Sequence, residues 1–338
     1  MLLSPLGWLY GKIADIRNAL YDRGTLRSYS LGAKTISVGN ITAGGTGKTP
    51  LVAYVAEILA DAGENVCILT RGYGRKSSGR VLVSDGERLL VDARTGGDEP
   101  VELAQKLIGK AIVVADANRV SAAAWAKQNF GVTAFVLDDG FQHRRAKRSL
   151  DIVCVDATNP WGKMIPAGLL REPLANLARG DAIVLTRCDL VDGVPVLLSW
   201  AATLNSAAQI FESHSEVVEV SNLRTFANSP RPRTDRGADI PALAFCGLAN
   251  PDGFFGSLRR ADFRIEATRS FPDHHYYTQA DVDEIERYAR ECGIGILLTT
   301  GKDAVKLIDL KFDLACYVIG AEVKLNDPDG FRELVLSA

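Results

Sequence analysis

The chain has 338 residues, of which 47% are hydrophobic and 24% are charged, and its formal net charge is −2. This length favours two domains, and the composition excludes an intrinsically disordered chain. The small negative charge argues against a dedicated nucleic-acid-binding protein, and six cysteines without a C-x-x-C pair argue against a disulfide framework or a zinc site.

The first twenty residues predict an amphipathic helix. Apolar residues recur there at intervals of 4, 3, 4, 3 and 4, which places them on one helical face: Leu2, Leu6, Leu9, Ile13, Ile16 and Leu20. This face could pack on the domain core, or it could belong to an interfacial helix that rests on a membrane or receives an acyl chain. No apolar run approaches the ~20 residues of a transmembrane helix, and the N-terminus lacks the basic leader of a secretory signal, so we expect neither.

The segment 34–50, KTISVGNITAGGTGKTP, joins an apolar strand to a glycine-rich loop that ends in Gly47-Lys48-Thr49. Such a loop surrounds phosphate oxygens with backbone N–H groups, its lysine supplies a positive charge, and its threonine hydroxyl reaches Mg²⁺. The helix that follows directs its positive N-terminal end at the same anion. The general pattern has a glycine five residues before Gly47, where this chain has Thr42. The segment therefore predicts a nucleoside triphosphate site with one departure from the usual loop.

Apolar, β-branched runs alternate with helical segments along the chain. Continuous apolarity is typical of strands buried on both faces, so the sheets should be largely parallel. We therefore expect an α/β fold: a P-loop NTPase-type, doubly wound, mostly parallel sheet with a second, smaller α/β domain and a hairpin-type linker. The runs are 35–38, 66–70, 111–115, 133–137, 152–155, 182–185, 243–246, 294–299 and 316–319.

Domain boundaries follow from the same patterns. Residues 1–25 form the amphipathic helix, 26–220 the P-loop domain and 221–338 a C-terminal α/β domain. Two short strands around Asp85-Gly86 predict a hairpin at 80–93. The polar, proline-rich stretch 228–239 is expected to be a loop near the domain boundary.

The run 133–140, TAFVLDDG, predicts a strand that ends in Asp138 and Asp139. A carboxylate at such a strand end completes a P-loop site by holding Mg²⁺. The sequence does not rank the two aspartates.

The stretch GFQHRRAKR at 140–148 is strongly basic. It is either a solvated loop or a dock for an anionic substrate, with Gln142 and His143 in contact. Further cations follow other expected strand ends, where an anionic ligand should bind: Arg71, Arg75, Arg119, Arg171 and Lys302.

Two further segments carry acids or histidines. In GGDEP, Asp98 and Glu99 begin a helix-like stretch, so they serve either as helix caps or, for one of them, as the acceptor of a hydroxyl proton. FPDHHYY contains the only adjacent histidines, His274 and His275. Too few further ligands surround them for zinc, and a carboxylate-supporting or phosphate-binding role fits better.

Taken together, the motifs resemble those of the tetraacyldisaccharide 4′-kinases, the lipid A 4′-kinases of Gram-negative bacteria. The resemblance runs from about residue 1 to 325 and includes the Thr42 departure. It rests on VGNITAGGTGKTP, RGYGRK, GGDEP, DDGFQHRR, DIVCVD, GKMIPAGLLREPL, FCGLANPDGF, FPDHHYYT and TTGKDAVKL, in this order.

The resemblance implies transfer of the ATP γ-phosphate to the 4′-hydroxyl of an acylated glucosamine disaccharide 1-phosphate. It implies a peripheral protein on the cytoplasmic face of the inner membrane, held by the N-terminal helix, with no nucleic acid and no obligate protein partner. By similarity, Asp98 is the general base and a histidine of FPDHH, His274 rather than His275, supports it across the two domains; this arrangement suggests that domain closure completes the site.

The remaining roles implied by the resemblance fall into three groups. ATP would be bound by Thr42, Ala43, Gly44, Gly45, Thr46, Gly47, Lys48 and Thr49, with Lys48 acting on the phosphates in catalysis. Mg²⁺ would be held by Thr49 with Glu99, Asp138 and Asp139 as the other candidates. The disaccharide and its phosphate would contact Tyr73, Arg119, Gln142, His143 and Arg171.

Two other functions compete with this interpretation. The first is a nucleotide switch, a P-loop GTPase or partner-loading ATPase of the metallochaperone type. LTRCDL at 185–190 loosely matches a guanine-reading T-K-x-D strand end, although Arg187 replaces the lysine. The second is a P-loop ligase that uses ATP to activate a carboxylate. Such a ligase would not require an amphipathic N-terminal helix.

Overall fold

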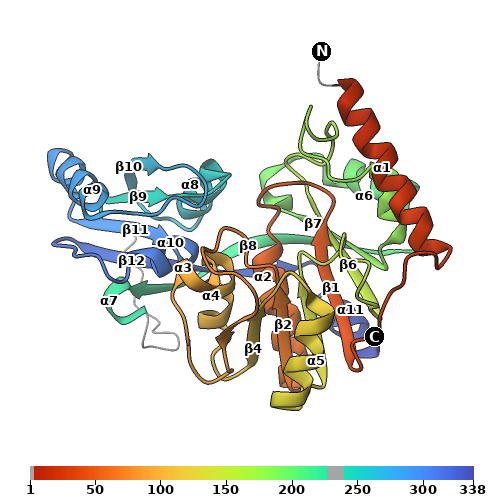
Figure 1. Cartoon of the computed structure of the whole chain (residues 1–338). Coiled ribbons are helices and arrows are strands. Elements are labelled where there is room, and N and C mark those ends of the chain that lie inside the picture. Colours follow the sequence, from red (N-terminus) through yellow and green to blue (C-terminus); the bar gives the residue numbers. More distant parts are fainter. Residues whose placement is uncertain (1–3, 227–239) are drawn as a thin grey trace. The chain divides into compact units, whose positions relative to one another are not determined.

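The computed structural model describes residues 4–226 and 240–338. The chain forms two compact units. Unit 1 comprises residues 1–71, 109–214 and 323–338, and unit 2 comprises 72–108 and 215–322. The chain passes between the units after Arg71 and after Ile108, and again within two long strands, β8 (Gln209–Asn222) and β12 (Ala315–Leu325). Figure 1 shows the course of the chain through these elements.

Unit 1 is built on a parallel sheet with the strand order β7-β6-β1-β5-β2-β4, and the first residues of β8 pair with β7. All residues of β2, β4, β5 and β7 are buried, as strands covered on both faces require. The predicted parallel α/β architecture is confirmed. The strands are β1 (Lys34–Asn40), β2 (Val66–Thr70), β4 (Ala111–Ala115), β5 (Ala134–Asp138), β6 (Leu150–Asp156) and β7 (Ala182–Thr186).

Helices cover this sheet. The most apolar side of α2 (Lys48–Asp61) packs on β1, β2 and β5, and α11 (Pro328–Ser337) packs on α2 through Tyr54 and Phe331, whose rings lie 5.9 Å apart. Because β1 is central, the loop between β1 and α2 lies beside the carboxyl ends of its neighbours β5 and β6. The other helical segments are α5 (Arg119–Phe130), η1 (Leu174–Arg179), η2 (Cys188–Leu190) and α6 (Val194–Leu204).

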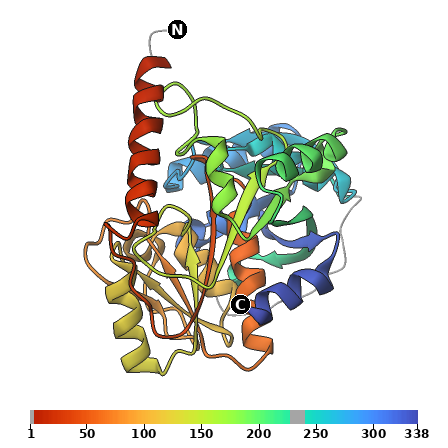
Figure 2. The ribbon, with the colours of Figure 1, turned by 90° about the vertical axis from the view of Figure 1, so that its right-hand side faces the viewer.

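The N-terminal helix α1 (Ser4–Asp22), drawn at the red end of the chain in Figure 2, buries the side that carries two glycines and an asparagine. Its buried residues are Gly7, Gly11 and Asn18. A Cβ atom at Gly7 would lie 3.0 Å from the carbonyl oxygen of Met164, so glycine permits this close approach. The opposite, apolar face is exposed: Leu6 53%, Leu9 51%, Ile13 57% and Ile16 61%. Leu2 lies outside the described residues.

The expectation that the apolar stripe packs on the core is therefore wrong for these four side chains. A helix that leaves four of its leucine and isoleucine side chains largely in solvent carries an exposed apolar face. None of the helices that the structure describes is both long and apolar enough to span a bilayer.

In unit 2, four neighbouring strands pair in parallel, in the order β10-β9-β11-β12. Its core lies between these strands and α9, with Phe245, Val282, Ile285 and Leu297 fully or almost fully buried. The strands are β3 (Val81–Ser84), β9 (Ala242–Cys246), β10 (Ile265–Ser270) and β11 (Ile296–Thr300). The helices are α3 (Ala93–Gly96), α4 (Asp98–Lys106), α7 (Leu223–Phe226), α8 (Pro251–Arg260), α9 (Gln279–Glu291) and α10 (Gly301–Leu307).

Three features differ from the expectations. Residues 72–108 belong to unit 2 and residues 323–338 to unit 1, so the chain crosses between the units more often than a single boundary at 220 allows. The segment 80–93 contains one strand, β3, and a single bridge from Ser84 to Leu89, instead of two strands. The predicted loop 228–239 lies outside the described residues.

Candidate active site

The glycine-rich loop of unit 1 connects β1 to α2, as predicted. Gly44 and Gly47 have φ angles of 109° and 75°, a region that glycine enters without strain. Inside the loop, the Asn40 side-chain amide donates to the Thr46 hydroxyl oxygen at 2.8 Å. On its outer side, the Ala43 N–H donates to the carbonyl oxygen of Leu169 at 2.7 Å. These bonds fix a loop whose helix begins at Lys48.

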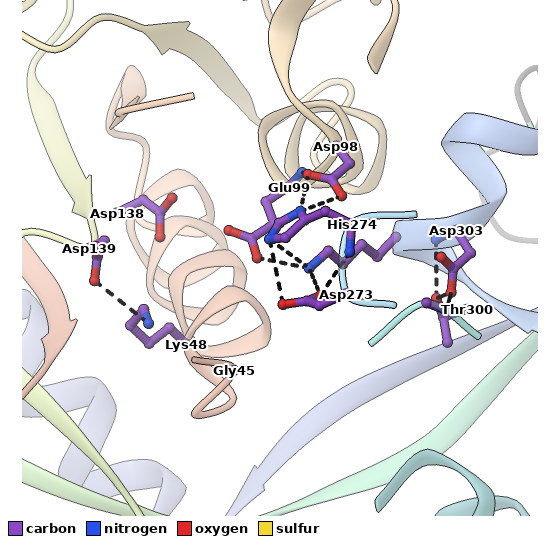
Figure 3. A network of polar contacts seen from close by, with 12 residues as sticks. Gly45, Lys48, Asp98, Glu99, Asp138, Asp139, Asp273, His274, Thr300 and Asp303 are labelled. Carbon is purple, nitrogen blue, oxygen red and sulfur yellow. Dashed lines mark hydrogen bonds and ion pairs between the residues drawn. The ribbon is translucent and has the colours of Figure 1, made fainter. Parts of the chain in front are cut away.

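Lys48 forms an ion pair with Asp139 (Figure 3), with Nζ 3.6 Å from Oδ1. The other carboxylate oxygen of Asp139 accepts a hydrogen bond from Arg171 Nη1 at 2.7 Å. Burial acts to raise the pKa of Asp139, but Lys48 and Arg171 outweigh it and lower that pKa. The structure thus brings together three residues that the sequence proposed separately for ATP, metal and substrate.

Asp138, the last residue of β5, faces the neighbouring strand. Its carboxylate accepts a hydrogen bond from the Thr70 hydroxyl at 2.8 Å, at the end of β2. The buried Arg119 side chain donates to the Asp138 carbonyl oxygen at 3.4 Å. Desolvation lowers the pKa of Arg119, and the two aspartates oppose that shift.

The basic segment after Asp139 contacts the end of β1, the strand that leads into the glycine-rich loop. Gln142 donates through Nε2 to the carbonyl oxygen of Asn40 at 2.7 Å. Burial, aided by the surrounding arginines, lowers the pKa of His143 to about 4, and its Nε2 is buried without a hydrogen-bond partner among the described residues. Arg171, which donates to Asp139, also lies 3.5 Å from Gln142 Oε1. The lowered pKa leaves His143 neutral at pH 7.

In unit 2, Asp98 and His274 form a hydrogen-bonded pair (Figure 3). His274 Nδ1 lies 2.8 Å and 3.1 Å from the two carboxylate oxygens of Asp98. Asp98 begins α4, and His274 lies in the turn after β10 with a φ of 60°. The Asp98 side chain is 5% exposed and that of His274 is 24% exposed. Both residues belong to one unit, so the prediction that this pair forms across two domains is wrong.

Charges around the pair are balanced by two lysines of α10. Lys302 Nζ lies 3.2 Å from Glu99 Oε1 and 3.1 Å from Asp273 Oδ1. The buried Lys306 pairs with Asp303 at 3.0 Å and lies 3.7 Å from Asp98. Burial acts to raise the pKa of Asp98, but the His274 hydrogen bond and the two lysines lower it overall.

The same hydrogen bond raises the pKa of His274, against burial and the charge of Lys302. The structure therefore pairs an ionised carboxylate with an imidazole, an arrangement that can accept and hold a proton.

The neighbouring residues separate into two groups. The Tyr73 ring lies 5.5 Å from that of His274 and is 69% exposed, so it borders the pair. His275 instead stacks on Phe271 at 4.8 Å and lies 3.4 Å from Asp281. Its place in the packing of unit 2 explains why the pair with Asp98 falls to His274.

The donor set of unit 1 fits a magnesium ion. No group of three or more His, Cys, Asp and Glu side chains in the described ranges could hold a metal alone. Magnesium in phosphoryl-transfer sites, however, takes one or two carboxylates, and phosphates and water complete its shell. Asp139 Oδ1 is buried and accepts no hydrogen bond from the described residues, and its ion pair with Lys48 is long, at 3.6 Å, so this oxygen could serve as such a ligand. Glu99, the fourth candidate, lies in unit 2 and pairs with Lys302.

Sequence reasoning missed some of these partners. Asp273 lies in FPDHHYY and Lys306 in TTGKDAVKL, but neither residue was assigned a role, although Lys306 follows Lys302 at the i,i+4 spacing that places both on one face of α10. Lys302, grouped with the cations for an anionic ligand, is paired with two carboxylates instead.

Comparison with known proteins gives one consistent answer. The family model described as Tetraacyldisaccharide-1-P 4′-kinase (LpxK) matches residues 1–338. The tetraacyldisaccharide 4′-kinase of Chlorobium phaeovibrioides is 39% identical and the alignment covers 99% of this chain and 95% of that protein. The kinase of the same name from Geobacter metallireducens is 38% identical, with 97% and 94% covered.

A solved structure agrees with these relatives. The crystal structure of LpxK from Aquifex aeolicus, described as in complex with ATP, has a TM-score of 0.80 and 33% sequence identity, and the match covers 100% of this chain and 99% of that one. The agreement of the family model, the relatives and this structure over nearly the whole length leads to one conclusion: the chain belongs to the tetraacyldisaccharide-1-phosphate 4′-kinase family.

Proposed function

We propose that this protein transfers the γ-phosphate of ATP to the 4′-hydroxyl of a tetraacylated glucosamine disaccharide 1-phosphate, a step of lipid A synthesis. The family supports the reaction, and the ATP named for the Aquifex structure supports the donor. The observation that carries the proposal furthest is the Asp98–His274 pair, because a nucleotide switch has no need of a base for a sugar hydroxyl.

Unit 1 would bind the nucleotide. Phosphoryl transfer depends mainly on charge neutralisation and in-line placement of the reactants. Lys48, which pairs with Asp139 in this structure, would bind the phosphates through its ammonium group. The loop amides would donate hydrogen bonds to the same phosphates, and the positive N-terminal end of α2 would stabilise their charge. Mg²⁺, held by Thr49 with Asp138 or Asp139, would supply further positive charge to the β and γ phosphates when bound.

Unit 2 would remove the proton of the acceptor hydroxyl. The lowered pKa of Asp98 keeps its carboxylate ionised at neutral pH, the state that a base requires. The proton of the 4′-hydroxyl would pass to this carboxylate, and the His274 Nδ1–H would orient it through the 2.8 Å hydrogen bond. Tyr73, exposed beside His274, would then contact the sugar.

The acylated substrate places the reaction at a lipid surface, and α1 supports this location. Leu6, Leu9, Ile13 and Ile16 expose more than half of their surface on one face, with the more exposed Trp8 beside them. An apolar helical face flanked by Lys12 and Arg17 is typical of helices that lie in a membrane interface. We place the protein on the cytoplasmic face of the inner membrane, held peripherally by α1.

The position of the new phosphate tests the proposal. The protein would be incubated with ATP, Mg²⁺ and the tetraacyldisaccharide 1-phosphate in detergent, and the product would be examined by ³¹P NMR. A second phosphomonoester coupled to the proton at sugar position 4′ is the expected result. A phosphate at another position, or an unchanged lipid, would refute the proposed reaction.

A further inference from the structure

The turn after β7 contacts the glycine-rich loop. The Thr186 hydroxyl donates to the carbonyl oxygen of Thr46 at 2.9 Å, and Arg187 Nη2 donates to the carbonyl oxygen of Gly45 at 2.7 Å. Both partners are backbone groups of the phosphate-binding loop, and all of these residues belong to unit 1. The proposed function gives this turn no role, and its resemblance to T-K-x-D is only loose.

Arg187 is held in place from two sides. Its backbone has a φ of 59°, which is uncommon for a residue other than glycine and turns the chain sharply at the strand end. Its guanidinium also forms an ion pair with Asp156, the last residue of β6. Because Asp156 neutralises the charge and fixes the planar group, Arg187 is directed at the loop carbonyl and is not a free cation for a phosphate.

Capture of these two carbonyls determines where the loop amides point. In a trans peptide the C=O and the following N–H lie in one plane and point in opposite directions. With the carbonyls of Gly45 and Thr46 held by Arg187 and Thr186, the N–H groups of Thr46 and Gly47 point away from that turn. Backbone N–H groups of such a loop are the donors that enclose phosphate oxygens.

We propose that Arg187, supported by Thr186 and Asp156, is a positioning residue that preorganises the phosphate-binding loop for the triphosphate. It acts through the loop backbone and not by touching the nucleotide. The proposal goes beyond the assigned reaction and rests on the proposed binding of ATP. Preorganisation strengthens binding because the loop is already ordered before the ligand arrives.

Nucleotide affinity of the full-length protein tests this role. The ligands would be ATP and tripolyphosphate, which carries the phosphates without a nucleoside, and dissociation constants would be measured by calorimetry. The variants are Arg187→Met, Arg187→Lys and Thr186→Val. Lys110→Met is the control, because Lys110 pairs with Glu57 and Asp61 at the far end of α2.

Loss of a hydrogen bond from a charged donor should weaken binding roughly 10- to 100-fold. Arg187→Met should weaken ATP and tripolyphosphate by the same factor, Thr186→Val should do so less, and Lys110→Met should have no effect. Arg187→Lys, which can replace only one of the two contacts, should fall between wild type and Arg187→Met. In the transfer assay, the KM for ATP should rise while the KM for the lipid stays constant.

Three results would overturn the inference. Weaker ATP binding with unchanged tripolyphosphate binding would mean that Arg187 contacts the nucleoside. Unchanged affinity for both ligands would mean that the loop orders itself. A parallel rise of both KM values would indicate general damage. If Arg187→Met does not fold, Thr186→Val and Arg187→Lys decide by the same criteria; wild-type protein that binds neither ligand would instead refute the proposed function on which the inference depends.

Discussion

Asp98 and His274 are 176 residues apart in the chain, yet His274 Nδ1 lies 2.8 Å from the Asp98 carboxylate. The contact forms because residues 72–108 belong to the same compact unit as 215–322. The segment that carries Asp98 thus leaves unit 1 and joins unit 2. The acid–imidazole pair is complete within unit 2 and needs no partner from unit 1.

A pair that acts as one base should respond to mutation as one unit. We expect Asp98→Asn to lower kcat by roughly 10²- to 10⁴-fold. His274→Ala should lower it less, because the carboxylate remains, and the double variant should be no slower than Asp98→Asn alone. Steady-state kinetics with saturating ATP and lipid would measure all three values.

The adjacent histidine provides the control for this cycle. His275→Ala removes a ring that stacks on Phe271, so it should lower the melting temperature and leave kcat nearly unchanged. Strictly additive losses in the Asp98 and His274 variants would argue against a joint role, and full activity of Asp98→Asn would exclude it as the base.

His143 predicts a loss of stability in acid. Its pKa is lowered from 6.5 to about 4 in the folded protein. Between these two values the unfolded chain binds more protons than the folded one, so the free energy of unfolding falls as the pH decreases from about 6.5 to about 4. Because water still reaches part of this ring and screens its charge, the total decline should be smaller than the about 3 kcal/mol that corresponds to the full shift.

Urea unfolding of His143→Gln across this pH range would test the effect. The variant should lose much of the acid-dependent decline of the wild type. His214, which is exposed on β8, is the matched control, and His214→Gln should keep the decline. A decline of equal size in wild type and His143→Gln would show that other groups cause it.

The two faces of α1 should separate membrane binding from folding. Ile13→Ser/Ile16→Ser changes only the exposed face and should reduce sedimentation with phosphatidylglycerol–phosphatidylethanolamine vesicles by about tenfold at an unchanged melting temperature. Asn18→Ala removes the 2.7 Å hydrogen bond to the buried Glu172 and should instead lower the melting temperature. Vesicle binding that survives the double serine change would exclude α1 as the anchor.

The sequence predicted the elements whose pattern is local. The runs at 66–70 and 111–115 coincide with β2 and β4, because fully buried strands are continuously apolar. The loop from β1 to α2 and the paired acids at the end of β5 were found for a second reason. In this fold class, the glycines, the lysine and the aspartates stand at the ends of neighbouring strands.

What the sequence did not predict depends on distant partners. β8 was missed because only one residue in several along it is buried, so it has no continuous apolar run. Helical spacing identified the apolar stripe of α1 but not its direction, which Gly7, Gly11 and Asn18 determine by packing on unit 1. The partners of Lys306, Asp98 and Asp303, come next to it only in the folded chain. The same holds for Arg187, which contacts Asp156 and the carbonyl oxygen of Gly45.

In the proposed reaction, Lys48 and its loop direct the γ-phosphate of ATP to a lipid hydroxyl. The most direct test is transfer of label from γ-labelled ATP, with Mg²⁺ and detergent, to the tetraacyldisaccharide 1-phosphate, for wild type and Lys48→Ala. We predict label in the lipid with wild type, and at least about 100-fold less with Lys48→Ala. The variant lacks the positive charge of Lys48, which would stabilise the negative charge of the transferred phosphate. Label released only as inorganic phosphate, or turnover of GTP but not of ATP, would contradict the claim.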